Sequence, residues 1–343
     1  MMDPVNETPW PVQVVPGWDR EGRPQVTVVL KATWSFDTGG RLEPVDRPPA
    51  PVAADAWRGD PGDTSLAAAR ETVPFKAGSE LLLSGTAHPP PGAVAMKVSV
   101  ALRRPGGDRW SKTVAVIGER RWERRPVLVQ TPPQPLAATP LIYEHAFGGR
   151  DPDNEDRAYA LNPVGRGYNP RPFRLTDTRL PLVESEPLLR GPHDRPPPAG
   201  FGPLSPLWEP RAGRLGEVDE GAALAAEACP WPAPLDPHAH HAAPQDQWFP
   251  RPLAGGEVLE LAGLFPGRPP SEPVSITLPA LRLRAGARVR GEAAARPLAL
   301  RCDTLVVDAD ARRLSLVFRG ALAGLSLHRA RGVVAVSLEE QGP

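Results

Sequence analysis

Cysteine and lysine are scarce in this sequence, and neither sign of charge is in excess. Its 343 residues include two cysteines, Cys229 and Cys302, which form no C-x-x-C pair. We therefore expect a reducing, cytoplasmic location and no disulfide framework. The 40 Lys and Arg residues balance 40 Asp and Glu residues. That balance argues against the broad basic surface of a protein that binds nucleic acid or anionic membranes.

Long apolar runs are also missing. No run approaches the roughly 20 residues that cross a bilayer. The segment from Met1 to Trp10 carries Asp3 and Glu7 and has no basic-then-apolar signal region. We expect a soluble cytoplasmic protein without membrane insertion.

The common catalytic motifs do not occur either. The sequence has no G-x-x-x-x-G-K phosphate loop, no G-x-S-x-G elbow and no H-E-x-x-H helix. Gly165-Arg166-Gly167 lacks the third glycine of a dinucleotide fingerprint. We therefore expect no enzymatic activity and no cofactor.

Proline, in contrast, is abundant. The 47 prolines and 32 glycines make up roughly a quarter of the chain, well above average usage. Proline removes backbone donors and interrupts helices, which excludes an all-helical bundle.

Alternating apolar residues predict strands in the first third. Residues 25–37 alternate, with Thr27, Lys31, Thr33 and Ser35 on the polar side, which predicts a strand with one buried face. Further strands are expected over 81–88 and in a hairpin formed by 96–102 and 110–117. A one-sided antiparallel unit must pack on a second sheet.

The last third again predicts strands, over 257–261, 274–284 (around Pro279), 298–308, 313–319 and 333–338. The expected fold is mainly β, with antiparallel sandwich-like lobes, a long loop insert and one short helix. We place the N-terminal β lobe at 1–125, the insert at 126–255 and the C-terminal β segment at 256–343.

The insert is rich in proline and in aromatic residues. We interpret it as ordered loops fixed to the core by aromatic rings, with disorder as the alternative. Glu217 to Cys229 is the expected helix, because acidic residues begin it and Pro230 ends it. The expected anchors are Tyr143, Phe147, Tyr159, Tyr168, Phe173, Phe201, Trp208, Trp231, Trp248 and Phe249.

Two segments resemble metal sites only in part. His238, His240 and His241 are not spaced like a structural zinc set, so solvated loop histidines are the preferred interpretation. Residues 151–156 alternate oxygen ligands like a calcium loop. Their sixth position is not glycine and their twelfth is not glutamate, which favours an acidic surface turn.

Four arginines, at 120, 121, 124 and 125, surround Trp122. These arginines could bind an acidic partner or a phosphate group. With zero net charge, a basic strand end exposed to water is the preferred interpretation.

An ordered series of motifs resembles the bacterial domain-of-unknown-function family 2169. Two of the matching segments are LIYEHAFGG at 141–149 and NPVGRG at 162–167. The resemblance covers about residues 5 to 320, and the other matching segments are 28–36, 39–42, 55–61, 74–78, 85–87, 118–122, 198–203, 242–247 and 303–307.

The resemblance implies a cytoplasmic adaptor or chaperone of type VI secretion, which binds an effector and helps to load it onto the spike protein. It also marks positions that either bind a partner or hold the structure, and we expect most motif glycines to be structural. These positions are Trp57, Phe75, Trp122, Tyr143, Phe147, Gly148, Gly149, Asn162, Pro163, Gly165, Arg166, Gly167, Phe201, Trp208, Pro244, Gln245 and Gln247.

Two alternatives remain open. One is a structural component that stays with the secreted spike. The other is a hydrolase that uses Glu144, His145 and Asp151, which lie close together in the sequence. Glu144 and His145 are expected on opposite faces of one strand, which argues against shared chemistry.

Overall fold

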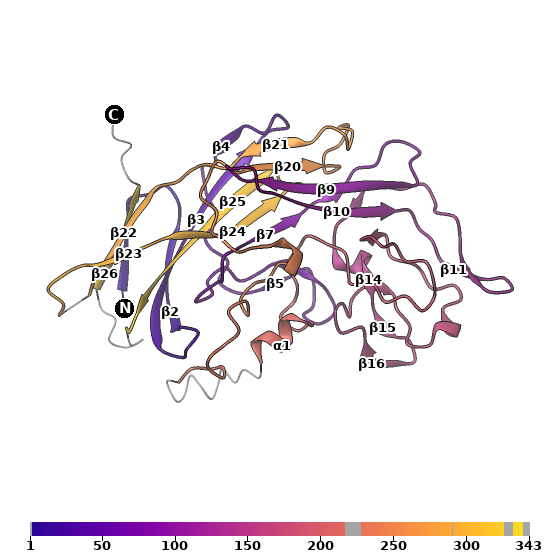
Figure 1. The fold of residues 1–343 in the computed structure, drawn as a ribbon, viewed down its shortest axis with the longest axis horizontal. Coiled ribbons are helices and arrows are strands. Elements are labelled where there is room, and N and C mark those ends of the chain that lie inside the picture. The colour runs from indigo at the N-terminus through magenta and orange to yellow at the C-terminus, as the bar shows by residue number, and fades with distance from the viewer. Residues whose placement is uncertain (1, 217–227, 290, 326–331, 339–343) are drawn as a thin grey trace.

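The computed structural model describes residues 2–216, 228–289, 291–325 and 332–338 (Figure 1). Within these ranges the protein is mainly β, and most strand pairs are antiparallel, as predicted. Most of the helix expected over 217–229 lies outside the described residues. The described α-helix is α1, five residues long. None of the described helices is long and apolar enough to cross a membrane.

The largest sheet has seven strands, in the order β19-β7-β24-β25-β3-β2 with β4 paired to β3. Only the β7–β24 pair is parallel. The strands are β2 (Val12–Trp18), β3 (Pro24–Phe36), β4 (Leu42–Pro44), β7 (Ser79–Ser84), β19 (Trp248–Phe249), β24 (Arg301–Asp308) and β25 (Arg313–Ala323).

A second sheet has five antiparallel strands, in the order β18-β10-β9-β20-β21. It contains the predicted hairpin, which forms β9 and β10. Its strands are β9 (Ala95–Arg103), β10 (Arg109–Ile117), β18 (Val183–Glu184), β20 (Val258–Ala262) and β21 (Val274–Thr277).

A third sheet has four strands, in the order β1-β26-β22-β23. The run predicted over 274–284 divides at Pro279, so β21 and β22 belong to different sheets. The strands of this sheet are β1 (Met2–Asn6), β22 (Leu283–Val289), β23 (Arg296–Leu298) and β26 (Gly332–Leu338).

Short elements make up the rest. The insert contributes α1 (Arg211–Leu215) and 3-10 turns at Tyr143–His145, Pro172–Arg174 and Gln245–Gln247. The two-stranded pairs are β5 (Ala56–Trp57) with β6 (Leu66–Ala68), β8 (Thr86–Ala87) with β13 (Thr139–Pro140), β11 (Trp122–Arg124) with β12 (Leu128–Gln130), β14 (Phe147–Gly148) with β17 (Arg166–Gly167), and β15 (Arg150–Asp151) with β16 (Asn154–Ala158).

The first and last thirds of the chain build the same sheets. β3 pairs with β25, β7 with β24 and β9 with β20. The insert adds only the short strands β18 and β19 to the outer edges of these sheets.

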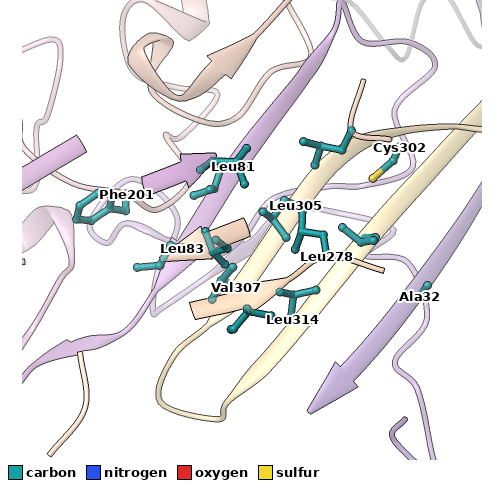
Figure 2. Close-up of a cluster of buried hydrophobic side chains, with 14 of the residues drawn as sticks. Ala32, Leu81, Leu83, Phe201, Leu278, Cys302, Leu305, Val307 and Leu314 are labelled. Atoms are coloured by element: carbon teal, nitrogen blue, oxygen red, sulfur yellow. The ribbon is translucent and has the colours of Figure 1, made fainter. Parts of the chain in front are cut away.

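One hydrophobic core joins the large sheets. Leu81 and Leu83 from β7 pack with Leu305 and Val307 from β24 (Figure 2). The same cluster contains the inward side chains of β9, β10, β20 and β21, together with Phe201 of the insert. The prediction that the hairpin packs on a second sheet is therefore confirmed.

The prediction that β3 has one buried face is wrong, because both faces are buried along most of its length. Residues 52–74 cover the side that carries the polar residues. There the Lys31 ammonium lies 2.8 Å from the Glu71 carboxylate, and the Pro74 carbonyl accepts hydrogen bonds from Gln25 and Thr27. The polar residues alternate as expected, but buried partners satisfy them instead of water.

The buried Lys31–Glu71 pair leads to a stability prediction. Lys31→Met should lower the free energy of unfolding by about 3–5 kcal/mol, because it leaves the Glu71 charge buried without a partner. Adding Glu71→Gln should recover a large part of that loss. Urea denaturation measures the free energy of unfolding of the single and the double variant. Lys97→Met, on the exposed side of β9, is the control. If the double variant is no more stable than Lys31→Met, the pair does not act as argued.

Candidate partner-binding surface

A buried carboxylate ties the insert to the large sheet. Glu80 on β7 forms an ion pair with Lys76 and accepts hydrogen bonds from the backbone N–H groups of Ala242 and Ala243, both 2.9 Å long. The His241 ring lies 3.4 Å from the same carboxylate. Motifs 74–78 and 242–247, far apart in the sequence, therefore meet at one side chain.

Burial by itself would raise the pKa of Glu80. The charge of Lys76 and the hydrogen bond to His241 outweigh burial and hold the pKa well below its usual range. A catalytic acid needs a raised pKa. Glu80 is instead an ionised carboxylate with structural partners.

Gln247 makes a second link to the same strand. Its side-chain amide donates to the carbonyls of Leu81 (2.7 Å) and Phe201 (2.9 Å). The segment at 198–203 is thereby fixed to the strand, and Phe201 is fully buried. Pro244 is half-buried, and Gln245 beside it is exposed.

A brace of hydrogen bonds holds the loops at 143–167. The Asn162 side-chain amide donates to the carbonyls of Tyr143 (2.8 Å) and Phe147 (3.1 Å), and the backbone carbonyl of Asn162 accepts from the Gly149 N–H. The Tyr143 ring packs edge-on against Trp208, with centroids 5.6 Å apart. The prediction that Asn162 braces a loop is confirmed.

Glycines are required at several points of this brace. Gly149 and Gly167 have φ values of +119° and +95°, which side chains rarely adopt. At Gly165 a Cβ would lie 2.4 Å from the Asn162 amide nitrogen. Gly148, also at positive φ, is buried beside them, while Pro163 is half-buried. These glycines serve the structure, as expected.

Of the ten expected ring anchors, five are buried, four are half-buried and Phe173 is exposed. Trp122, Phe147 and Trp208 are almost fully buried. Trp57 packs on Leu66 and Leu82, and Phe75 lies 4.7 Å from the His240 ring. The prediction is wrong for Phe173, whose side chain is 63% exposed.

The three histidines are not a set of solvated loop residues. His241 is buried against Glu80, and its Nε2 atom lies 2.9 Å from the Ala77 carbonyl. His238 stacks on Trp248, with centroids 4.9 Å apart. The His240 side chain is buried between Phe75 and Trp231. The preference for solvated histidines was wrong for His240 and His241, because the insert folds back over β7.

Burial lowers the pKa of His240 to about 3, with further contributions from Arg211, Arg319, Lys76 and Arg70. The ring is therefore uncharged at neutral pH. In the part of the chain that the structure describes, no three or more His, Cys, Asp or Glu side chains are grouped to hold a metal ion.

The three residues weighed for a hydrolase have separate structural partners. Glu144 accepts hydrogen bonds from the Ser65 backbone (2.8 Å) and hydroxyl (2.7 Å), and His145 bonds to the Pro140 carbonyl. Asp151 is buried and pairs with Arg171 at 2.8 Å, so the acidic surface turn expected over 151–156 is wrong at this residue. Glu144 and His145 lie in a 3-10 turn, not on a strand as predicted.

Of the four arginines around Trp122, one is buried. Arg120 pairs with Glu184 and donates to Gln130 (3.0 Å) and to the Pro181 carbonyl (3.0 Å). The expectation that all four arginines are solvated is therefore wrong for Arg120. Glu184 also accepts from the Leu189 backbone at 2.8 Å, so the pair fixes β11 and β12 to the underlying loops.

Beyond this pair the β11–β12 hairpin projects at the end of the molecule opposite the sheet that contains β22, β23 and β26 (Figure 1). Val127, in its turn, is 67% exposed. The Arg124 guanidinium donates to the Phe173 carbonyl at 3.0 Å, which brings Phe173 beside the hairpin. Arg121, Arg124 and Arg125, on or beside the same hairpin, are exposed. We call Val127, Phe173 and these three arginines the projecting surface.

The projecting surface combines features that protein interfaces favour: large apolar side chains, arginines and a rigid support. Most of the motif residues lie below it, in the core and the loops. Arg166 pairs with Glu119 at 3.0 Å and is half-buried. Sequence reasoning identified the arginines, did not single out Val127, and assigned Phe173 to the interior.

Comparison with known proteins gives one match. A family model described as "Uncharacterized protein conserved in bacteria (DUF2169)" matches residues 21–319. No curated protein and no solved structure shows significant similarity.

The lowered pKa of His240 predicts a pH dependence of stability. In the unfolded chain His240 becomes protonated below about pH 6.5, whereas in the folded protein it becomes protonated only below about pH 3. Between these limits, each pH unit by which the pH falls should lower the free energy of unfolding by about 1.4 kcal/mol through His240. Urea denaturation from pH 7.5 to 4 should show a shallower decline for His240→Asn than for the wild type. The exposed His193→Asn is the control, and an unchanged slope for His240→Asn would contradict the argument.

Proposed function

Because the chain belongs to the DUF2169 family of uncharacterized proteins conserved in bacteria, we propose that it is a non-enzymatic adaptor. In this proposal it binds a type VI secretion effector in the cytoplasm and helps to load it onto the spike protein. The resemblance described above supplies the link to type VI secretion, and the projecting surface supplies the physical support.

The observation that carries the proposal is the exposure of Val127, in the turn of a braced hairpin, and of Phe173, whose carbonyl accepts a hydrogen bond from Arg124 of that hairpin. Exposed large apolar side chains that gather on one surface mark interaction sites more often than scattered ones do. The arginines of the projecting surface add positive charge, which complements an acidic rim on a partner. We therefore expect this surface to bind an apolar patch edged by Asp or Glu.

Rigidity supports the same role. The Arg120–Glu184 pair and the buried Trp122 fix the base of the hairpin before any partner arrives. A preorganised surface loses little conformational entropy on binding, so more of the contact energy contributes to affinity.

Deletion in the host tests the proposed role. Removal of the gene should lower the abundance of its effector and the amount of effector that co-purifies with the spike. Unchanged values of both would contradict the adaptor role. Recovery of this chain with the secreted spike in the medium would instead support a structural spike component.

Charge placed on the projecting surface tests the interface. Val127→Asp and Phe173→Asp should each weaken effector binding by at least about tenfold, or ~1.4 kcal/mol, in calorimetric titrations. Both residues are exposed, so the melting temperature should stay unchanged. Val94→Asp, at another exposed valine, is the matched control. Wild-type affinity in both variants would exclude this surface as the effector interface.

A further inference from the structure

A cavity of about 440 Å³ lies between the edge strand β2, the segment before β7 and the insert. Its volume is in the range of pockets that bind small ligands or short peptide segments. None of the motif positions singled out from the sequence lines it. The cavity is also distinct from the projecting surface, with which it shares no residue.

The walls of the cavity are apolar and stiff. Trp18 and Trp231 meet edge to face, with ring centroids 6.2 Å apart. Prolines at 16, 74, 206 and 230 line the remaining wall. Tryptophan and proline lose little conformational freedom on binding, so these walls are suited to an apolar side chain.

Three polar nitrogen atoms at this cavity are buried and have no hydrogen-bond partner among the residues that the structure describes: Nε of Arg211, Nε1 of Trp231 and Nε2 of His240. The side chains of Arg211 and His240 are themselves buried, with residue exposures of 5% and 9%. Buried donors without partners are costly and uncommon in folded proteins. Two of the three atoms, Nε of Arg211 and Nε1 of Trp231, are donors, and Nε2 of His240 is a donor in one of its two neutral tautomers. These donors favour a ligand that accepts hydrogen bonds.

The charges at the cavity favour a single negative charge. Arg70 and Arg211 line it, and Asp55 lies 3.8 Å from Nη1 of Arg211. His240 is uncharged, so the charged side chains among the described residues that line the cavity sum to +1. That sum matches a carboxylate better than a phosphate, which carries more charge. A planar carboxylate also fits a guanidinium group.

We propose that this cavity binds a carboxylate carried by an apolar segment of the partner polypeptide. The inference rests on the proposed adaptor function, which supplies the polypeptide. The carboxylate lies against Arg70 and Arg211, and the neighbouring apolar side chain lies against the wall formed by Trp18 and Trp231. The carboxylate comes either from a chain terminus or from an acidic side chain.

Calorimetric titration of the full chain with short peptides tests the proposal. The probes are acetyl-Pro-Leu-Ala-Pro-Leu-Leu with a free C-terminus, the same peptide as its amide, and an amide with Glu at the fifth position. Binding of the free acid alone assigns a terminal carboxylate, and binding of the Glu peptide assigns a side chain. Equal binding of the neutral amide, or no binding of any probe at millimolar concentration, would overturn the proposal.

Variants locate the binding. Arg70→Gln and Trp231→Phe should each weaken binding of the charged probe at least tenfold. Arg41→Gln and Trp110→Phe, matched changes outside the cavity, should leave it unchanged. Arg70 is exposed and not part of the core, so its variant should fold normally, which a melting curve checks. Equal weakening in the controls would place the binding elsewhere.

Two further outcomes separate this proposal from the adaptor function. If indole-3-propionate binds and the peptides do not, the ligand is a free carboxylic acid and the polypeptide assignment is overturned. If the effector binds Arg70→Gln and Trp231→Phe with wild-type affinity but loses affinity for Phe173→Asp, the adaptor function stands and the cavity has no part in it.

Discussion

The Glu80 carboxylate is the interaction on which the loop layer depends. It is fully buried, pairs with Lys76 and accepts two backbone N–H groups from the insert. A buried charge of this kind is stable only when its partners stay in place. The insert therefore cannot lift from β7 at this point without exposing an unpaired carboxylate or leaving the amides of Ala242 and Ala243 unsatisfied.

The same arrangement, in which a glutamate carboxylate accepts hydrogen bonds from backbone N–H groups, recurs in other loop segments. A loop-rich layer leaves backbone N–H groups without strand partners, and those groups still need acceptors when they are buried. Acidic side chains supply them in this protein: Glu71 to Val52, Glu144 to Ser65, Glu184 to Leu189, and Glu257 to Ala254 and Gly255. Acidic residues in this protein thus replace hydrogen bonds that a sheet would have provided.

Such a scaffold suits recognition of another polypeptide. Carboxylates, rings and prolines hold long loops in one conformation, so the projecting surface and the cavity keep their shapes without a bound ligand. The two sites differ in chemistry. The projecting surface offers exposed apolar side chains and arginines, and the cavity offers buried hydrogen-bond donors beside two tryptophans. Two distinct contacts on one rigid body would let an adaptor hold an effector in a fixed orientation.

Local pattern alone was enough to predict the β class, the hairpins that form β9–β10 and β24–β25, and the ring-anchored insert, because alternation and turn residues act over short distances. Asn162 and the glycines beside it were also identified as structural from their local chemistry. Only the tertiary structure decided that Lys31, Arg120, His240 and His241 are buried, that Phe173 is exposed, and that Trp18, Arg211 and Trp231 share one cavity. The reason is physical: whether a polar or aromatic side chain meets water or a partner depends on segments up to hundreds of residues away, and no local pattern records where those segments fold.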